Sequence, residues 1–79
     1  MHFLNVGFGN FVAINRVLTV ITPESAPIKR YIAKLRAEDM LMDLTFGKTS
    51  RSLIVLDNGQ AVLSPVHPET IVGRVEKIH

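Results

Sequence analysis

The residues of this 79-residue chain that are best suited to bind a ligand are three cations, Arg16, Lys48 and Arg51. Arg16 interrupts an apolar stretch, so its long side chain must reach solvent or a partner. Lys48 and Arg51 belong to a short loop that also contains Gly, Thr and Ser, whose hydroxyl and amide groups can donate to phosphate oxygens. If both segments lie at one rim of the fold, they form a small phosphate-binding surface. Spacing alone favours the simpler interpretation of exposed, solubilising loops, because charged residues lie on the surface by default.

Patterns for catalysis, metals and nucleotides are missing from the sequence. The chain has no cysteine, and its three histidines, His2, His67 and His79, lie far apart. Gly47 begins a Gly-Lys-Thr triplet like the end of a phosphate-binding P-loop, but that motif needs a glycine where Met42 stands. His67, directly before a proline, is expected to lie at the entry of a helix. We therefore expect a non-enzymatic protein with no cofactor, no metal and no small-molecule substrate.

Size and composition point to one domain, residues 1–79, that associates with itself. A chain this short buries only about 60% of the surface that it exposes when unfolded. Yet 47% of its residues are hydrophobic, and there is no cysteine to supply a disulfide. The formal net charge is only +2, although a homo-oligomer would repeat any local basic patch. The N-terminus lacks the pattern of a secretory signal and no apolar run is long enough to span a membrane, so we expect a cytoplasmic protein.

Hydrophobic periodicity predicts an α+β fold with a mainly antiparallel sheet. Segments rich in β-branched or apolar residues predict strands at 3–6, 11–14, 17–22, 41–45, 51–56 and 61–64. A polar interruption at Asn15-Arg16 suggests a bulge or tight turn, and Asn58-Gly59 predicts a two-residue hairpin loop with positive φ at both positions. Strand 51–56 is apolar on both faces, which indicates burial on both. One helix can cover one face, and the other needs a short C-terminal helix, predicted at 68–77, or a neighbouring subunit.

The segment 22–30 fixes the start of a central amphipathic helix, predicted at 26–39. Ser25 can cap its first turn, and Pro27 has no amide hydrogen to leave unsatisfied there. Lys29 and Arg30 follow immediately, and they are equally compatible with solvent exposure and with pairing to acidic residues across a subunit contact. Two further helix cations, Lys34 and Arg36, are interpreted as a solvated face.

Three segments together resemble the bacterial extracellular-matrix regulator family, the RemA-like proteins. They are Asn-Val-Gly-Phe-Gly-Asn at 5–10, Thr-Pro-Glu-Ser-Ala-Pro-Ile-Lys-Arg at 22–30 and His-Pro-Glu-Thr-Ile at 67–71. The resemblance covers residues 3–74. It implies a small DNA-binding regulator that assembles into a ring-shaped homo-oligomer, with a fold like the DNA-reading domain of LytTR response regulators. In some members of the family it implies activation of genes for the biofilm matrix.

The resemblance also assigns candidate DNA-binding residues. Arg16 matches an arginine implicated in DNA binding, and Gly47, Lys48 and Arg51 match a basic Gly-Arg-Arg-Thr-Arg loop. Lys48 replaces the first arginine of that pair and Thr49 replaces the second. Lysine keeps a charge for phosphate but cannot form the bidentate fork of arginine, and threonine removes one charge. Binding is therefore expected to be weaker or less specific than in relatives with both arginines, or lost.

Two functions follow as alternatives. The first is a transcription regulator whose homo-oligomeric ring presents Arg16, Lys48, Thr49 and Arg51 repeatedly to double-stranded DNA, with affinity mainly from phosphates. The second is a ring-forming scaffold or protein-interaction module that has lost DNA binding, supported by Thr49 and the modest charge. In either case Pro27, Lys29 and Arg30 are candidates for structural or subunit-contact roles, and no membrane partner is expected.

Overall fold

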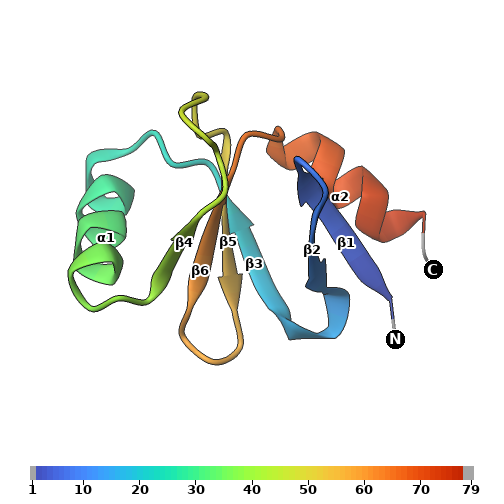
Figure 1. Ribbon diagram of the computed structural model, residues 1–79, viewed down its shortest axis with the longest axis horizontal. Helices are drawn as coiled ribbons and strands as arrows, with labels where there is room; N and C mark the ends of the chain where they lie inside the picture. The colour runs from blue at the N-terminus through green and yellow to red at the C-terminus, as the bar shows by residue number, and fades with distance from the viewer. Residues whose placement is uncertain (1, 78–79) are drawn as a thin grey trace.

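The structure, a computed structural model, describes residues 2–77, so His79 lies outside the described residues. Over this range the chain forms three layers, with a four-stranded sheet in the middle (Figure 1). Helix α1 covers one face of the sheet, and a β-hairpin together with helix α2 covers the other. The elements in chain order are β1 (Phe3–Gly7), β2 (Asn10–Ala13), the 3-10 helix η1 (Ile14–Arg16), β3 (Val17–Ile21), α1 (Ala26–Ala37), β4 (Leu41–Asp43), β5 (Ser52–Leu56), β6 (Ala61–Ser64) and α2 (Pro68–Glu76).

The predicted α+β class and mainly antiparallel sheet are confirmed. The central sheet has the strand order β3-β5-β6-β4, in which β5 pairs antiparallel with both β3 and β6. Only β4 runs parallel to its neighbour β6. Strands β1 and β2 form a separate antiparallel hairpin. Within the described chain, the outer edges of β3 and β4 pair with no further strand.

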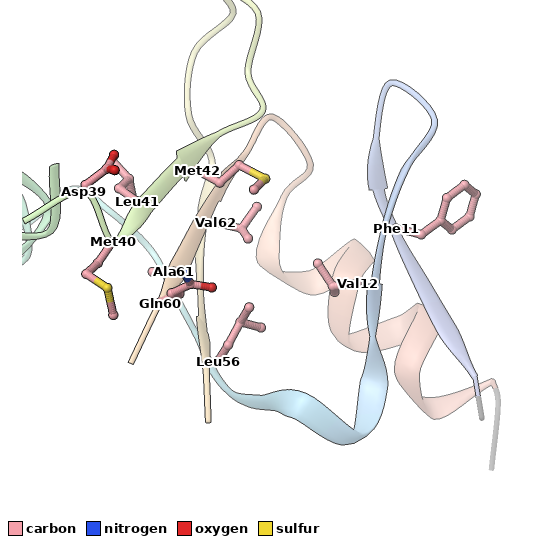
Figure 2. Close-up of a pocket in the computed structure, with 10 residues that line it drawn as sticks. All are labelled: Phe11, Val12, Asp39, Met40, Leu41, Met42, Leu56, Gln60, Ala61 and Val62. Carbon is pink, nitrogen blue, oxygen red and sulfur yellow. The ribbon is translucent and has the colours of Figure 1, made fainter. Parts of the chain in front are cut away.

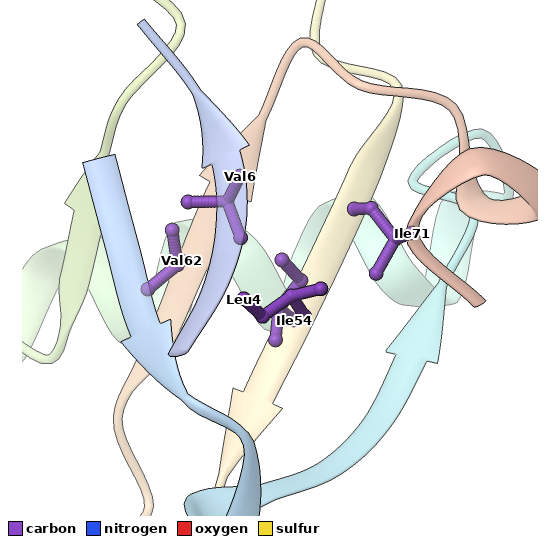
Figure 3. Close-up of a cluster of buried hydrophobic side chains, with 5 residues drawn as sticks. All are labelled: Leu4, Val6, Ile54, Val62 and Ile71. Carbon is purple, nitrogen blue, oxygen red and sulfur yellow. The ribbon is translucent and has the colours of Figure 1, made fainter. Parts of the chain in front are cut away.

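Both faces of the central sheet are buried, as the two-sided apolar pattern of β5 predicts. Ile54 and Val62 face the hairpin and α2, where they pack with Leu4, Val6 and Ile71 (Figure 3). The alternate residues face α1 and pack with Leu35; they are Leu53, Ala61 and Leu63. This alternation follows from the two-residue period of a strand. The second cover on the sheet comes from this chain itself, from α2 and the N-terminal hairpin.

Helix α1 begins as its sequence predicts and ends two residues early. Its N-cap is Ser25, whose hydroxyl oxygen accepts a hydrogen bond from the amide of Ile28 at 3.3 Å, and Pro27 lies in the first turn. The helix stops at Ala37 because Asp39 adopts a left-handed backbone, with φ of 58°. The next amide, that of Met40, then donates to the carbonyl of Leu35 at 2.8 Å and closes the helix end.

Of two local predictions, one is confirmed and one is wrong. Asn15 and Arg16 lie in η1, a single 3-10 turn in which the amide of Val17 donates to the carbonyl of Ile14, so the polar interruption is a tight turn; a bulge follows it, where the pairing with β5 shifts between Val17 and Thr19. The β5–β6 loop has three residues, because the amide of Leu56 donates to the carbonyl of Gln60 and the amide of Gly59 donates back to Leu56. Only Gly59 in that loop has positive φ, the arrangement of a turn followed by a glycine bulge.

Among residues 2–77, neither helix has the length and apolar character that crossing a lipid bilayer would require.

Candidate nucleic-acid interface

The loop between β4 and β5 presents the cations Lys48 and Arg51 at one end of the sheet (Figure 1). It starts with a tight turn in which the amide of Lys48 donates to the carbonyl of Thr45 at 3.0 Å. The two central residues, Phe46 and Gly47, have φ of 51° and 82°. Two consecutive positive values are typical of a type I′ turn. The turn therefore places an exposed phenylalanine immediately before the basic part of the loop.

Asp43 fixes the base of this loop. Its Oδ1 accepts hydrogen bonds from the hydroxyl of Thr45 at 2.6 Å and from the amide of Thr45 at 3.0 Å. The side-chain bond and then the backbone bond lower the pKa of Asp43 below its ordinary value of 3.8, whereas burial acts in the opposite direction. The guanidinium of Arg36, 3.8 Å away, lowers the pKa further. Arg36 is exposed, as the prediction of a solvated helix face requires, and its guanidinium also lies within ion-pair distance of β4.

A second turn of the same kind reaches the basic loop from the N-terminal hairpin. Phe8 and Gly9 connect β1 to β2 with φ of 52° and 73°. The ring of Phe8 meets the ring of Phe46 edge to face, with centroids 5.1 Å apart and planes at 76°. Both side chains are more than half exposed, at 56% for Phe8 and 68% for Phe46. The two turns together form an aromatic tip beside Lys48.

This tip is sterically costly. The first position of a type I′ turn favours Asn, Asp or Gly, because a bulky side chain at positive φ crowds its own backbone. A residue held in a sparsely populated backbone region costs about 1–3 kcal/mol. An aromatic pair of this geometry returns about 0.5–1.5 kcal/mol. The fold therefore gains little or nothing from having phenylalanine at both positions.

The hairpin turn is braced from three sides. Asn5 Oδ1 accepts from the amide of Gly7 at 2.9 Å, and Asn10 Nδ2 donates to the carbonyl of Gly7 at 3.1 Å. The buried hydroxyl of Ser64 donates to the carbonyl of Val6 at 2.6 Å and ties β1 to β6. A Cβ atom on Gly7 would lie 3.1 Å from Pro65, so the turn and the β6–α2 connection are in close contact. The position of Phe8 is consequently well defined.

The surroundings of the tip favour an anionic partner. Lys48, Thr49 and Arg51 are exposed, and within residues 2–77 their side chains make no ion pair or hydrogen bond to other parts of the chain. The two segments that carry the turns, 2–23 and 44–56, contain no Asp or Glu. Their cations are therefore not neutralised by an acid on the same segment. Free ammonium, guanidinium and hydroxyl donors can bind phosphate oxygens.

The connection between β2 and β3, which contains η1 and ends with Arg16, lies at the opposite end of the sheet from the β4–β5 loop (Figure 1). Arg16 Nη1 donates to Asp57 Oδ2 at 3.2 Å, and Asp57 follows the far end of β5. The five residues of β5 span roughly 17 Å. Within one chain, then, the structure brings together Lys48, Thr49 and Arg51, but it separates Arg16 from them.

The other sequence-derived candidates lie on α1. Pro27, Lys29 and Arg30 are all exposed in its first turns, and α1 begins at the end of the molecule where the basic loop lies (Figure 1). Among the described residues, neither Lys29 nor Arg30 forms an ion pair. Both cations therefore remain available to a partner, whether that partner is solvent, phosphate or an acidic surface.

A second feature is an apolar groove of about 340 Å³ beside the free edge of β4. Figure 2 shows Val12 of β2 on one side, Met42 of β4 on the other, and Leu56 and Val62 between them. Met42 is 60% exposed, which is high for a large apolar side chain on a sheet. At the opposite edge of the sheet, Leu18 lies in the β3 bulge and is 67% exposed. Each edge of the central sheet thus carries an uncovered apolar side chain.

Sequence reasoning missed both the aromatic tip and the groove. A signal for the tip was present, since each phenylalanine precedes a glycine in a turn-forming context. The contact between Phe8 and Phe46 joins residues 38 positions apart and has no local signature. The groove forms between β2 and β4, which come together only in the folded chain.

Comparison with known proteins gives a consistent result. The model of the RemA-like family, described as extracellular matrix regulatory protein A-like, matches residues 3–75. Candidate regulatory proteins from Bacillus cytotoxicus, Bacillus mycoides and Bacillus cereus are each 48% identical to this chain over 75 residues. Those matches cover 95% of this chain and 86% of each relative.

Proposed function

Because this chain belongs to the RemA-like family of extracellular matrix regulatory proteins, we propose that it is a cytoplasmic, non-enzymatic regulator that binds double-stranded DNA as a ring-shaped homo-oligomer. The description of the family model names an extracellular matrix regulatory protein, and control of biofilm-matrix genes is the role that the resemblance to this family implies for the chain. The single observation that carries the proposal is the exposed, acid-free loop with Lys48 and Arg51, held in place by the Asp43–Thr45 hydrogen bonds.

DNA affinity in this proposal comes mainly from phosphates. Lys48 acts as a point charge, Arg51 can form two parallel hydrogen bonds to one phosphate, and Thr49 offers a hydroxyl. Two cations on one loop give weak binding for a single copy. A ring repeats that loop, and contacts made simultaneously by several copies raise the overall affinity without any new type of contact. The oligomer is therefore an integral part of the proposed function.

Assembly of the ring is supported by the two apolar edges of the sheet. Leu18 is exposed on the edge strand β3, and the groove beside Met42 lies at the β4 edge. We propose that Leu18 of one copy occupies the groove of the next. A contact between two different surfaces of the same chain is heterologous, and it closes into a ring when the rotation between copies allows.

Arg16 takes a separate role in the proposed complex. Its distance from the basic loop means that one phosphate group cannot contact both parts of a single copy. We propose that Arg16 contacts the duplex at a second position, either farther along the backbone or next to the loop of a neighbouring copy. The ion pair with Asp57 is exposed, so exchange of that carboxylate for a phosphate costs little.

The test is a fluorescence-anisotropy titration of labelled duplex DNA at several salt concentrations. For the wild type we expect the logarithm of the affinity to fall steeply and linearly with the logarithm of the salt concentration. Arg51→Ala should reduce that slope by about 0.9 for each copy that contacts DNA. Lys34→Ala is the matched control, because it removes the same charge from an exposed position on α1. Light scattering should show the same oligomer mass for all three proteins.

The alternative function is a ring-forming scaffold that no longer binds DNA. It is favoured by Thr49, which stands where the family pattern implies an arginine, and by the small net charge. No binding by the wild type at low salt, together with an intact oligomer, would establish this alternative and reject the DNA-binding regulator.

A further inference from the structure

Two phenylalanines occupy equivalent, unfavourable positions in two unrelated turns. Phe8 and Phe46 each precede a glycine, and each has φ close to 50°. Asn at the same position would suit the turn better and would leave no large apolar ring in solvent. Backbone strain of this kind persists where the surrounding structure enforces it, and it concentrates at functional sites. The same unfavourable residue in two turns that touch each other indicates that the two phenylalanines serve one function.

The two aromatic side chains form one exposed surface in which Phe46 lies outermost and Phe8 supports it. They meet edge to face and both remain exposed, so they form a narrow ridge. Phe46 is the more exposed of the two, and it directly precedes Gly47 and Lys48. Phe8 supports it from the braced hairpin turn, whose backbone is bonded to Asn5, Asn10 and Ser64. The ridge is thus rigid, apolar at its tip and cationic on one flank.

This combination fits the stacked bases of a duplex. Proteins that bend DNA insert apolar side chains such as Phe or Leu between base pairs from the minor groove, while nearby cations bind the phosphates. An acidic or purely apolar protein partner would explain only half of the arrangement. Segments 2–23 and 44–56 contain no Asp or Glu, so no acidic side chain on them repels a phosphate backbone, and the positive charges of Lys48 and Arg51 attract it.

We propose that Phe46, supported by Phe8, is a wedge that partly unstacks one base step of the bound duplex while Lys48 and Arg51 hold the flanking phosphates. The inference rests on the DNA-binding function proposed above and specifies what the same loop contacts besides phosphate. In this proposal the protein prefers DNA sequences that deform easily, because pyrimidine–purine steps such as TA unstack most readily, whereas A-tracts resist unstacking. Each copy in a ring would insert one wedge, so the DNA would bend progressively along the oligomer.

The experiment uses two duplexes of equal length, one with regularly spaced TA steps and one made of A-tracts. Each carries 2-aminopurine in its central part to report unstacking and a dye pair at its ends to report bending. The proteins compared are the wild type, Phe46→Asn, Phe46→Leu and Phe8→Asn. Phe3→Thr is the control, because Phe3 is an equally exposed phenylalanine at the far end of the hairpin.

The wild type and Phe3→Thr should raise the 2-aminopurine fluorescence and shorten the end-to-end distance of the TA duplex. Phe46→Asn should do neither and should bind that duplex about tenfold more weakly, with its salt slope unchanged. Phe46→Leu should retain most of the bend, because leucine is also an effective wedge. Phe8→Asn should lie between the wild type and Phe46→Asn.

Three results would overturn the wedge. Salt-dependent binding by the wild type without unstacking or bending would reject it and leave the DNA-binding function standing. A smaller oligomer for Phe46→Asn or Phe8→Asn in light scattering would mean that the two phenylalanine side chains lie at a contact between subunits. No DNA binding by the wild type at low salt would reject the wedge and the proposed function together.

Discussion

One carboxylate oxygen, Asp43 Oδ1, accepts both the hydroxyl and the amide hydrogen of Thr45, at 2.6 Å and 3.0 Å. Thr45 is buried, and its carbonyl in turn accepts the amide of Lys48. The last residue of β4 is therefore linked through Thr45 to the first cation of the basic loop. These hydrogen bonds hold the start of the loop in place.

Asp43→Ala should destabilise the fold, because it leaves the buried hydroxyl of Thr45 without its acceptor. We expect a cost of about 1–3 kcal/mol, measured by urea denaturation. Asp43→Asn is the matched variant and should cost less, because its amide oxygen can still accept from Thr45. Equal stability of Asp43→Ala and the wild type would mean that the loop is held by other contacts.

The same link predicts a pH dependence. The pKa of Asp43 is lower in the folded protein than its ordinary value of 3.8, so its stabilisation is fully present above pH 3.8. It is lost as the pH falls from 3.8 through the lower pKa of the folded state. The stability difference between the wild type and Asp43→Asn should therefore shrink only in that acidic range. A difference that is constant down to strong acid would contradict the assignment.

Phe46→Asn should stabilise the protein while it impairs the proposed DNA contact. Relief of the unfavourable φ is worth about 1–3 kcal/mol, against about 0.5–1.5 kcal/mol lost with the aromatic pair. A net gain of about 1 kcal/mol corresponds to a rise in Tm of roughly 4–8 °C for a domain of this size. Calorimetry at one fixed protein concentration measures it. A clear fall in Tm would show that the Phe8–Phe46 contact supports the fold itself.

Local chemistry made much of the fold predictable. Ser25 and Pro27 act within one helical turn, so the start of α1 follows from the sequence, and the β6 strand was predicted with its observed bounds, Ala61–Ser64. The β5–β6 turn was predicted wrongly because Asn58 is compatible with both loop lengths. The choice between them depends on how Leu56 pairs with Gln60 across the strands.

The site was less predictable than the fold, because it depends on contacts between distant segments. The loop cations could be named from their residue types, but their separation from Arg16 depends on which ends of β5 they flank. The contact of Phe8 with Phe46 needs the hairpin to pack on the sheet next to the β4–β5 loop. Neither relationship leaves a periodic or local pattern in the sequence.

Thr49→Arg should strengthen DNA binding. The residue is exposed on the basic loop, so an arginine fits without repacking and supplies the charge that the family pattern implies there. We expect the salt slope to steepen by about 0.9 for each copy in contact. Ala33→Arg, at an exposed position on α1, is the control for a general increase in positive charge. An equal gain from both variants would indicate a nonspecific charge effect.

Arg16→Ala should weaken DNA binding without disturbing the oligomer or the stability. The ion pair that it removes is exposed on both sides and is worth only about 0–1 kcal/mol. Asp57→Asn is the complementary variant, since it releases Arg16 from its partner and should maintain or raise the affinity. Anisotropy and light scattering give the two readouts. Dissociation of the ring by Arg16→Ala would instead assign this arginine a structural role.

The contact between copies can be tested with two variants that block opposite surfaces. Met42→Lys places a positive charge in the groove, and Leu18→Lys places one on the residue proposed to enter it; both positions are exposed, so the monomer should still fold. Each variant alone should be monomeric by light scattering, whereas Val72→Lys, an exposed apolar position on α2, should retain the ring.

Mixing the two monomeric variants then provides the decisive result. The Met42→Lys chain still has Leu18, and the Leu18→Lys chain still has an intact groove, so one contact can form between them. The second contact would bring the two introduced lysines together, and their like charges would prevent it. A heterologous interface therefore predicts a 1:1 dimer that grows no further. A symmetric interface, in which the same surface meets itself, predicts no such pairing. A mixture that stays monomeric, or a single variant that keeps the full ring mass, would refute the contact between Leu18 and the groove.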